Sequence, residues 1–96
     1  MKGGWVYIVT NRALGALYTG VTNDIARRAW EHRQRMGSGF TARYGIDRLV
    51  YMERHEDIEA AIKHETRIKH WRRSWKLDLI EMGNPGWEDL FDWLNS

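Results

Sequence analysis

The sequence predicts an α+β fold in which a small three-stranded sheet, mixed or antiparallel, packs with helices in the order ββαβαα. Two observations predict it. Strand-like runs occupy residues 5–10, 16–21 and 48–53, and helical apolar periodicity covers about 24–35 and 57–71. Three short strands cannot bury their own apolar faces. The helices must therefore cover the sheet.

The first two strands form a hairpin that leads into a helix. Side chains alternate in character over residues 5–10, so successive residues point to opposite faces of a strand. Asn-Arg-Ala-Leu-Gly at 11–15 supplies a turn. The second strand follows at 16–21, and Thr-Asn-Asp at 22–24 offers side-chain oxygens that can cap the first helix.

Glycine and proline divide the rest of the chain. Residues 36–45 contain three glycines and are predicted to be a mobile loop between the first helix and the third strand. A further helix is expected at about 72–82. The final segment, 83–96, opens with Gly-Asn-Pro-Gly and closes in a short helix over 87–94. We therefore expect a domain over 1–82 with the final segment packed on it as a C-terminal cap.

The composition limits the class of protein. Ninety-six residues make one domain, and 43% hydrophobic with 29% charged residues is typical of a globular chain. Cysteine is absent, which excludes disulfides and thiolate metal sites and favours a reducing cytoplasm. No apolar run is long enough for a membrane span, and the N-terminus leads straight into a strand. We expect no membrane association, no signal peptide and a cytoplasmic location.

The charge is unevenly spread. All 15 Lys and Arg lie in residues 1–79 with 9 acids, a balance of +6, whereas residues 80–96 hold four acids and no Lys or Arg. A basic body of this kind suits a polyanionic partner such as nucleic acid. A solvated surface of mixed charge explains the same counts.

A carboxylate interrupts the apolar stripe of the helix at 57–71. Helical spacing places Glu65 in one stripe with Ile58, Ala61, Ile62 and Ile68. Burying an unpaired charge is costly, so this position needs a reason. Three reasons are open: an ion pair with an inward arginine, a place at the stripe edge where the carboxylate reaches water, or a bound cation.

The first helix has a similar anomaly. Its inward stripe is formed by Ile25, Arg28, Ala29 and His32, so two polar residues lie on a packing face. Arg28 and Glu65 thus approach the same sheet from two helices. One reading is a buried ion pair in a structural or partner-binding domain, although such pairs often gain little over apolar packing. The other is a site in which both residues face a phosphate, with a cation between oxygen atoms.

A spaced set of residues resembles the GIY-YIG nuclease family. Its first motif is present as Trp5-Val6-Tyr7 and its second as Tyr18-Thr19-Gly20. Arg28 stands where the family carries its catalytic arginine, and His32 where the family has His or Tyr. Glu65 occupies the position of the metal-binding carboxylate. Trp and Thr replace the usual glycine and isoleucine of the two motifs.

The resemblance covers roughly residues 3–79. It is strongest to small standalone bacterial members, which are similar to the excinuclease catalytic domain. It implies a metal-dependent endonuclease that hydrolyses DNA phosphodiester bonds in DNA repair or processing. Branched or flapped DNA and a partner protein that supplies specificity are part of this expectation. The alternative is a nucleic-acid-binding module with weak or no catalytic turnover.

The resemblance also implies a role for each site residue. Glu65 would hold one divalent ion, Mg²⁺ or Mn²⁺, and Arg28 would stabilise charge in the transition state. Tyr7 is the family's candidate for the general base, with Tyr18 orienting the water or phosphate. A tyrosine is a poor base at neutral pH. His32 titrates in a better range and is the alternative base or a proton relay.

Further residues are expected to contact the substrate. Phe40 and Tyr44 could either stack on a base or pack in the core. His55, His64 and His70 have no spacing that indicates a metal site. Individually, each basic residue is more often an ordinary solvated surface charge. The predicted phosphate contacts are Arg27, Arg33, Arg35, Arg43, Lys63, Lys69, Arg72 and Arg73.

Overall fold

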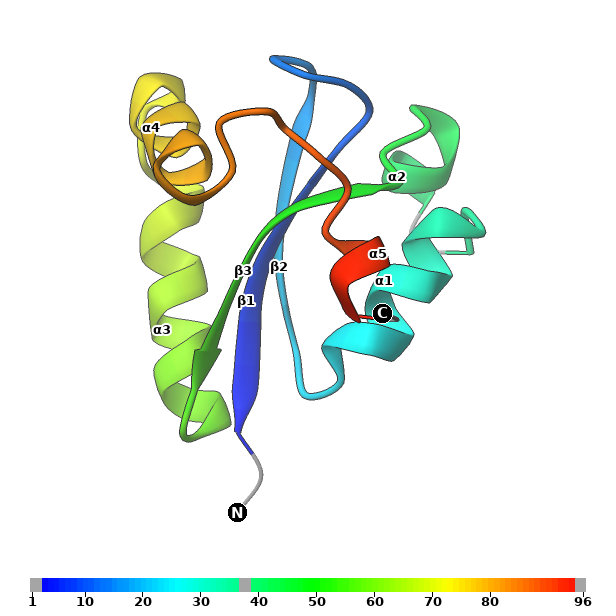
Figure 1. The fold of residues 1–96 in the computed structure, drawn as a ribbon. Coiled ribbons are helices and arrows are strands. Elements are labelled where there is room, and N and C mark those ends of the chain that lie inside the picture. The colour runs from blue at the N-terminus through cyan, green and yellow to red at the C-terminus, as the bar shows by residue number, and fades with distance from the viewer. Residues whose placement is uncertain (1–2, 37–38, 95–96) are drawn as a thin grey trace.

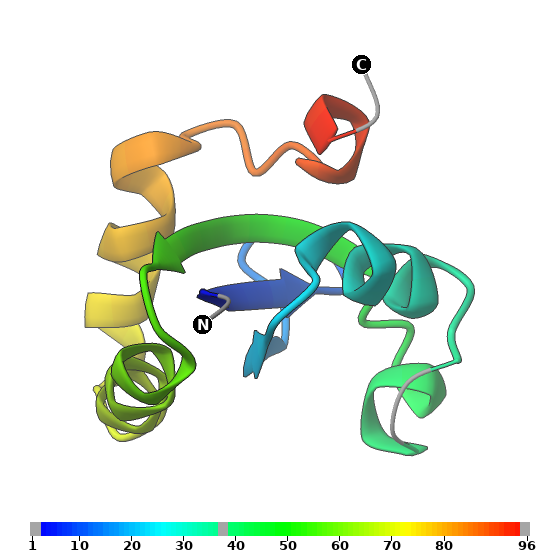
Figure 2. The ribbon, with the colours of Figure 1, turned by 90° about the horizontal axis from the view of Figure 1, so that it is seen from below.

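The computed structural model describes residues 3–36 and 39–94, and its core is a three-stranded antiparallel sheet of order β2-β1-β3 with helices on both faces (Figures 1 and 2). The predicted α+β class is confirmed. The strands are β1 (Gly4–Thr10), β2 (Leu17–Thr22) and β3 (Arg48–His55), and the helices are α1 (Ile25–Arg33), α2 (Gly39–Arg43), α3 (Ile58–Lys69), α4 (Arg73–Gly83) and α5 (Phe91–Leu94).

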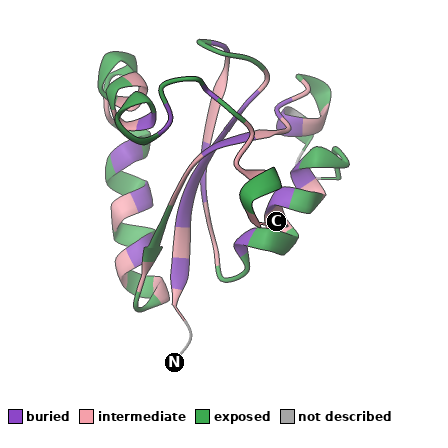
Figure 3. Ribbon diagram, in the orientation of Figure 1, coloured by how far each residue is buried: buried purple, intermediate pink, exposed green. Residues whose placement is uncertain are grey.

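The central strand β1 is buried on both sides (Figure 3). Val6 and Ile8 point to the face covered by α3 and α4, where they join a core with Val50. Tyr7 and Val9 point to the opposite face, which is covered by α1 and the C-terminal segment. The predicted alternation is therefore correct, and it divides the core into two layers on either side of one sheet.

α3 lies very close to the start of β1. A Cβ atom on Gly4 would come within 2.5 Å of Ile58 Cδ1 and 2.9 Å of Ala61 Cβ, so only glycine permits this approach. Asp57 caps the helix by accepting a hydrogen bond from the Ala60 amide at 2.7 Å. The buried stripe consists of Ala61, Glu65 and Ile68. Ile62, predicted to lie in it, is 46% exposed because it falls at the outer border of the stripe.

α1 begins as predicted. The Asp24 carboxylate accepts from the Arg27 amide at 3.1 Å, and Ile25, Ala29 and His32 are buried against the sheet. Arg28 lies at the edge of this stripe rather than within it, with 41% of its side chain exposed. The expectation that Arg28 is an inward residue was therefore only half correct.

Two short helices differ from the prediction. The expected loop at 36–45 contains α2, and Ile46 closes it by donating its amide to the Thr41 carbonyl at 2.9 Å. Thr41 and Ile46 are both buried, so packing stabilises a segment whose glycines predict disorder. The closing helix begins at Phe91 instead of 87 because the preceding residues bond to β3: the Leu90 amide donates to the Leu49 carbonyl at 2.7 Å.

The C-terminal segment is fixed by buried polar contacts. The side-chain amide of Asn84 donates to the Val50 carbonyl at 3.2 Å. Trp87 is 3% exposed and packs in the core beside α3 and α4. Arg33 of α1 pairs with Asp89 at 2.6 Å. The division into a domain over 1–82 and a cap over 83–96 stays a prediction. None of the helices formed by the described residues has the length and apolar character of a membrane span.

Candidate active site

Tyr7 lies across the hairpin at Gly20. The two residues are partners in the β1–β2 register, and a Cβ on Gly20 would come within 2.5 Å of the Tyr7 Cζ and Oη atoms. The missing side chain therefore makes the space that the phenol occupies. Tyr7 is 2% exposed. The tyrosine of the first motif and the glycine of the second are thus two halves of one packing arrangement.

His32 joins this pair from α1. Its Nε2 atom lies 3.1 Å from the Tyr7 hydroxyl oxygen, and its ring centroid lies 5.5 Å from that of Tyr7 and 5.9 Å from that of Tyr18. His32 is 3% exposed, and its Nδ1 has no hydrogen-bond partner among the described residues. The hairpin and α1 therefore assemble two tyrosines around a buried imidazole.

Charges from two helices act on the Tyr7 phenol. Burial is the main cause that raises its pKa well above 10, while the positive charge of Arg28 lowers it and the negative charge of Glu65 raises it. α1 and α3 cover opposite faces of the sheet (Figure 2), but β2 is an edge strand, so the two faces meet along its open side. Arg28 and Glu65 therefore both act electrostatically on Tyr7, although each is paired with a residue of its own helix.

Arg28 and Glu65 form no ion pair among the described residues, so the alternative reading of a buried pair between them is wrong. Arg28 lies 3.7 Å from Glu31 on its own helix. Glu65, which is 7% exposed, instead forms an ion pair with Lys69 one turn later, with 2.6 Å between Glu65 Oε2 and Lys69 Nζ. The hydrogen bond from Lys69 to Glu65 raises the lysine pKa. The carboxylate in the apolar stripe is thus neutralised by its own helix, because a long lysine side chain at i+4 reaches it from the surface.

A polar hollow of about 450 Å³ opens beside Arg28. It lies where β2 turns into α1, and the backbone and side chains that line it carry both signs of charge. Because Arg28 is half-exposed at its rim and only loosely paired, its guanidinium is available to an anion that enters. The lining residues are Thr22, Asn23, Asp24, Arg27, Arg28 and Glu31.

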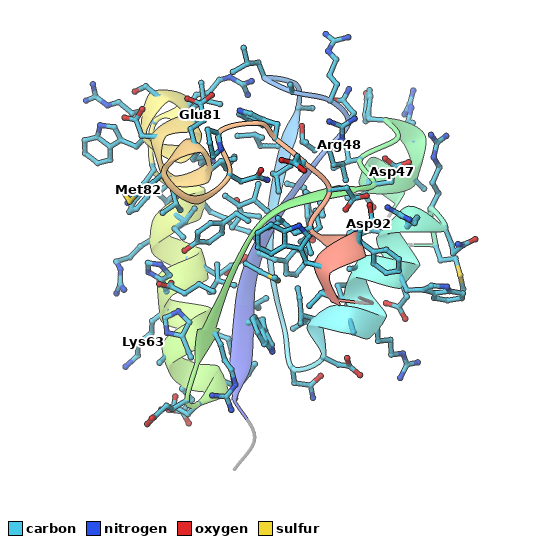
Figure 4. The ribbon with its side chains drawn as sticks, in the orientation of Figure 1. Asp47, Arg48, Lys63, Glu81, Met82 and Asp92 are labelled. Carbon is cyan, nitrogen blue, oxygen red and sulfur yellow. The ribbon has the colours of Figure 1, made fainter. Side chains whose placement is uncertain are left out.

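Several of the predicted phosphate contacts are solvent-facing. Arg27 has 77% of its side chain exposed, and Lys63 projects from α3 away from the sheet (Figure 4). Arg72 lies over the exposed Trp75 ring at 5.1 Å, and Arg43 lies over the Tyr44 ring at 5.7 Å.

The other predicted phosphate contacts have partners within the chain. Arg33 bonds Asp89 and lies 4.4 Å over the Phe91 ring, which ties α1 to the C-terminal segment. Arg73 donates to the Leu14 and Gly15 carbonyls at 2.7 Å, and Arg35 pairs with Asp47 at 3.2 Å. Each has a structural role that the sequence did not indicate.

The expected stacking segment lies on and after α2. Tyr44 is 53% exposed, and the Phe40 side chain lies outside the described residues. The guanidinium of Arg43 lies 5.7 Å from the centre of the Tyr44 ring.

Comparison with known protein families shows which family this chain belongs to. A family model of the GIY-YIG catalytic domain matches residues 3–78, which include both tyrosine motifs, α1 and α3. The chain belongs to the GIY-YIG family. Membership of this family indicates a nuclease, and GIY-YIG nucleases are generally dependent on divalent metal ions.

Bacterial proteins of similar length are similar to most of this chain. A UPF0213 protein of Staphylococcus saprophyticus is 37% identical over 83 residues, which cover 86% of this chain and 100% of the relative. A UPF0213 protein of Staphylococcus aureus is 37% identical over 81 residues, covering 84% and 98%. The solution structure of a UPF0213 protein from Bacillus halodurans is similar with a TM-score of 0.56 and 31% identity, over 91% of this chain and 92% of that one.

The sequence did not reveal one further cluster. Glu53, His55 and His64 offer three ligand atoms that all lie within 4.8 Å of one another. Two of them alternate on β3, but the third comes from α3, nine residues beyond His55. Strand alternation puts Glu53 and His55 on the same face of β3. The position of His64 beside them depends on the turn between β3 and α3.

Proposed function

We propose that this GIY-YIG protein is a divalent-metal-dependent endonuclease that hydrolyses DNA phosphodiester bonds in DNA repair or processing. One observation supports it above the rest. The hydrogen-bonded Tyr7–His32 pair lies where charges from Arg28 and Glu65 both act. A base with a proton acceptor behind it, a guanidinium and a carboxylate are groups that suit the hydrolysis of a phosphodiester.

Tyr7 and His32 together provide the base. Burial and then the Arg28 charge lower the pKa of His32, so the imidazole is neutral at pH 7 and its Nε2 can accept the Tyr7 proton. Tyr7 alone is a weak base because its raised pKa keeps it protonated. As the attacking water gives its proton to the phenol oxygen, the phenol gives its own to His32. This relay assigns the two candidates successive roles.

Arg28 is the residue that would stabilise the negative charge of the transition state. Its nearest acid, Glu31, lies 3.7 Å away, and 41% of its side chain is exposed beside the polar hollow. Little free energy holds it in that position, since partly exposed ion pairs contribute roughly 0–1 kcal/mol. Arg28 is therefore able to turn to a phosphate and to stabilise the charge that builds up during attack.

The chemistry of Glu65 fits a divalent metal ion. It offers carboxylate oxygens, which hard cations such as Mg²⁺ and Mn²⁺ prefer, and Lys69 occupies only one of them. Glu65 would hold the ion, with water and phosphate oxygens as the remaining ligands. When bound, such an ion neutralises the scissile phosphate and stabilises the leaving oxygen.

A nucleic-acid-binding module without turnover is the second candidate. The Lys69–Glu65 contact favours it, because the carboxylate already has a cationic partner. The exposed residues Arg27, Lys63 and Arg72 would serve binding equally well in either case. The proposal includes a cytoplasmic location, branched or flapped DNA as substrate, and a partner protein that adds specificity.

Cleavage assays separate the candidates. The protein is incubated with single-stranded, duplex, flapped and branched DNA in Mg²⁺, Mn²⁺ or EDTA, beside Arg28→Ala and Glu65→Ala. We expect metal-dependent cleavage that falls on the order of a hundredfold in Arg28→Ala. Arg27→Ala is the matched control, since Arg27 precedes Arg28 on α1 and pairs with the same Glu31.

The outcomes point in different directions. Cleavage that persists in both Arg28→Ala and Glu65→Ala would come from a contaminant and would refute the assignment. Salt-sensitive DNA binding with no cleavage of any substrate would establish the binding module instead. Equal losses in Arg27→Ala and Arg28→Ala would reduce Arg28 to a general phosphate contact.

A further inference from the structure

A second cluster of metal-ligating side chains lies apart from the Tyr7 site. On β3, Glu53 and His55 point to the α3 side of the sheet, since they pair in register with Val6 and Gly4 of β1. His64 comes from α3. The Glu53 Oε1 atom lies 3.1 Å from His55 Nε2 and 3.0 Å from His64 Nε2, and the two imidazole centroids are 5.2 Å apart.

We propose that Glu53, His55 and His64 form a binding site for a divalent transition metal of the Zn²⁺ class. Two imidazole nitrogens and one carboxylate oxygen are a donor set that zinc takes readily, and three protein ligands leave one position for water. In a tetrahedral zinc site with bonds of about 2.0–2.1 Å, neighbouring ligand atoms lie about 3.3 Å apart. The observed separations from Oε1 to the two nitrogens are near this value.

The surrounding contacts hold the ligands in place. Tyr51 lies two residues before Glu53 on the same face of β3, next to the Glu53 carboxylate. The imidazoles are largely covered, with 21% of the His55 side chain and 19% of the His64 side chain exposed. Glu53 is 46% exposed, which leaves the cluster open to solvent on one side for entry of an ion. Partners of this kind orient ligands and strengthen metal binding.

Arg67 opposes the ion in the metal-free protein. Its Nη2 lies 3.2 Å from His64 Nδ1. Because a guanidinium can only donate, Nδ1 accepts, and the ring proton sits on Nε2, where it is shared with Glu53. Metal binding through Nε2 requires the other tautomer, so Arg67 must turn away. Its positive charge also repels a cation. Removal of Arg67 should therefore tighten binding, whereas a cluster that only forms hydrogen bonds would show no such gain.

The ion would join the end of β3 to the middle of α3. This site is distinct from the proposed nuclease site, because Glu65 lies about 100° away from His64 around the helix. A metal at His64 would nevertheless stiffen the helix that presents Glu65.

Metal titration of the full chain tests the site. Metal-stripped protein is titrated with Zn²⁺ by calorimetry and with Co²⁺ by visible absorption, and thermal unfolding is followed with and without Zn²⁺. We expect one tight equivalent, a Co²⁺ spectrum typical of tetrahedral nitrogen and oxygen ligands, and a higher unfolding temperature with Zn²⁺. His55→Ala and His64→Ala should each weaken binding at least tenfold.

The variants make the result specific. His70→Ala is the matched control, since His70 is exposed at the end of α3, and it should bind Zn²⁺ as the wild type does. Arg67→Ala should bind severalfold more tightly. If one histidine variant fails to fold by circular dichroism, Glu53→Gln and the other histidine variant decide. The proposal is overturned if the wild type takes up no Zn²⁺, or if the ligand variants bind it as tightly as His70→Ala does.

Discussion

Alanine in place of Gly20 should disable the site while leaving the fold in place. The new Cβ would lie 2.5 Å from the Tyr7 Cζ and Oη atoms, whereas carbon atoms in good contact are about 3.5 Å apart. The ring must therefore move by about 1 Å, and the 3.1 Å hydrogen bond to His32 would be broken. A misplacement of this size can cost about a hundredfold in rate.

The effect on stability should be smaller. Overpacking a filled site costs about 1–3 kcal/mol, and replacing a strand glycine returns about 0.5–1 kcal/mol of backbone entropy. We therefore expect Gly20→Ala to lower the free energy of unfolding by about 1–2 kcal/mol, measured by urea denaturation. A domain with the usual stability of about 5–15 kcal/mol would remain folded.

Single-turnover cleavage of a labelled DNA substrate measures the rate. Gly83→Ala is the control, because no atom lies within 4 Å of its added Cβ, and it should cleave at the wild-type rate. The double variant with Tyr7→Phe tests the cause. If Gly20→Ala acts through Tyr7, the two losses will not multiply. A Gly20→Ala protein with the wild-type rate would refute the Tyr7–His32 relay, and multiplicative losses would mean that Gly20 acts elsewhere.

Three other substitutions probe the remaining contacts. Arg28→Ala should change the free energy of unfolding by less than about 0.5 kcal/mol, because its ion pair is long and half-exposed; a large loss in urea denaturation would reveal a structural role. His32 has a lowered pKa in the folded protein, so stability should fall as the pH drops below about 6.5, where only the unfolded chain takes up this proton. His32→Phe should flatten that slope in melts between pH 7 and 5, and an equal slope would contradict the assignment. Asn84→Ala should cost about 2–4 kcal/mol in the same denaturation assay, since it removes three partly buried hydrogen bonds; a loss below about 1 kcal/mol would mean that water replaces them.

The order of elements could be predicted because the local signals agree with the packing. The alternation of β1 gives its two buried faces, and Asp24 and Asp57 cap the helices that follow. The short helices could not be placed in the same way. α2 depends on the burial of Ile46, and the start of α5 depends on Asp89, which accepts from Leu49 of β3 as well as from Phe91. Such long-range bonds leave no local pattern.

The candidate site was predictable in its members but not in its contacts. The resemblance to the family's motifs proposes Tyr7, Arg28 and Glu65, because each motif lies within one strand or helix. Which groups touch depends on side-chain direction across elements. In the structure, His32 is hydrogen-bonded to Tyr7. Arg28 and Glu65 do not contact each other, because each forms an ion pair with a residue of its own helix. The Glu53 cluster was missed for the same reason, because its ligands come from two elements.

The Lys69–Glu65 pair suggests how a buried carboxylate can be accommodated without a metal ion and still be able to bind one. Half of the Lys69 side chain is exposed, and pairs at i,i+4 on a helix contribute only about 0.2–0.5 kcal/mol. An unpaired carboxylate at 7% exposure would cost several times more. Lys69 thus offsets only part of the penalty for placing Glu65 in an apolar stripe, and under the proposed function a divalent ion would have to displace its half-exposed ammonium. A long, mobile ammonium is better suited to this than an inward arginine, whose bidentate pair would keep the carboxylate engaged.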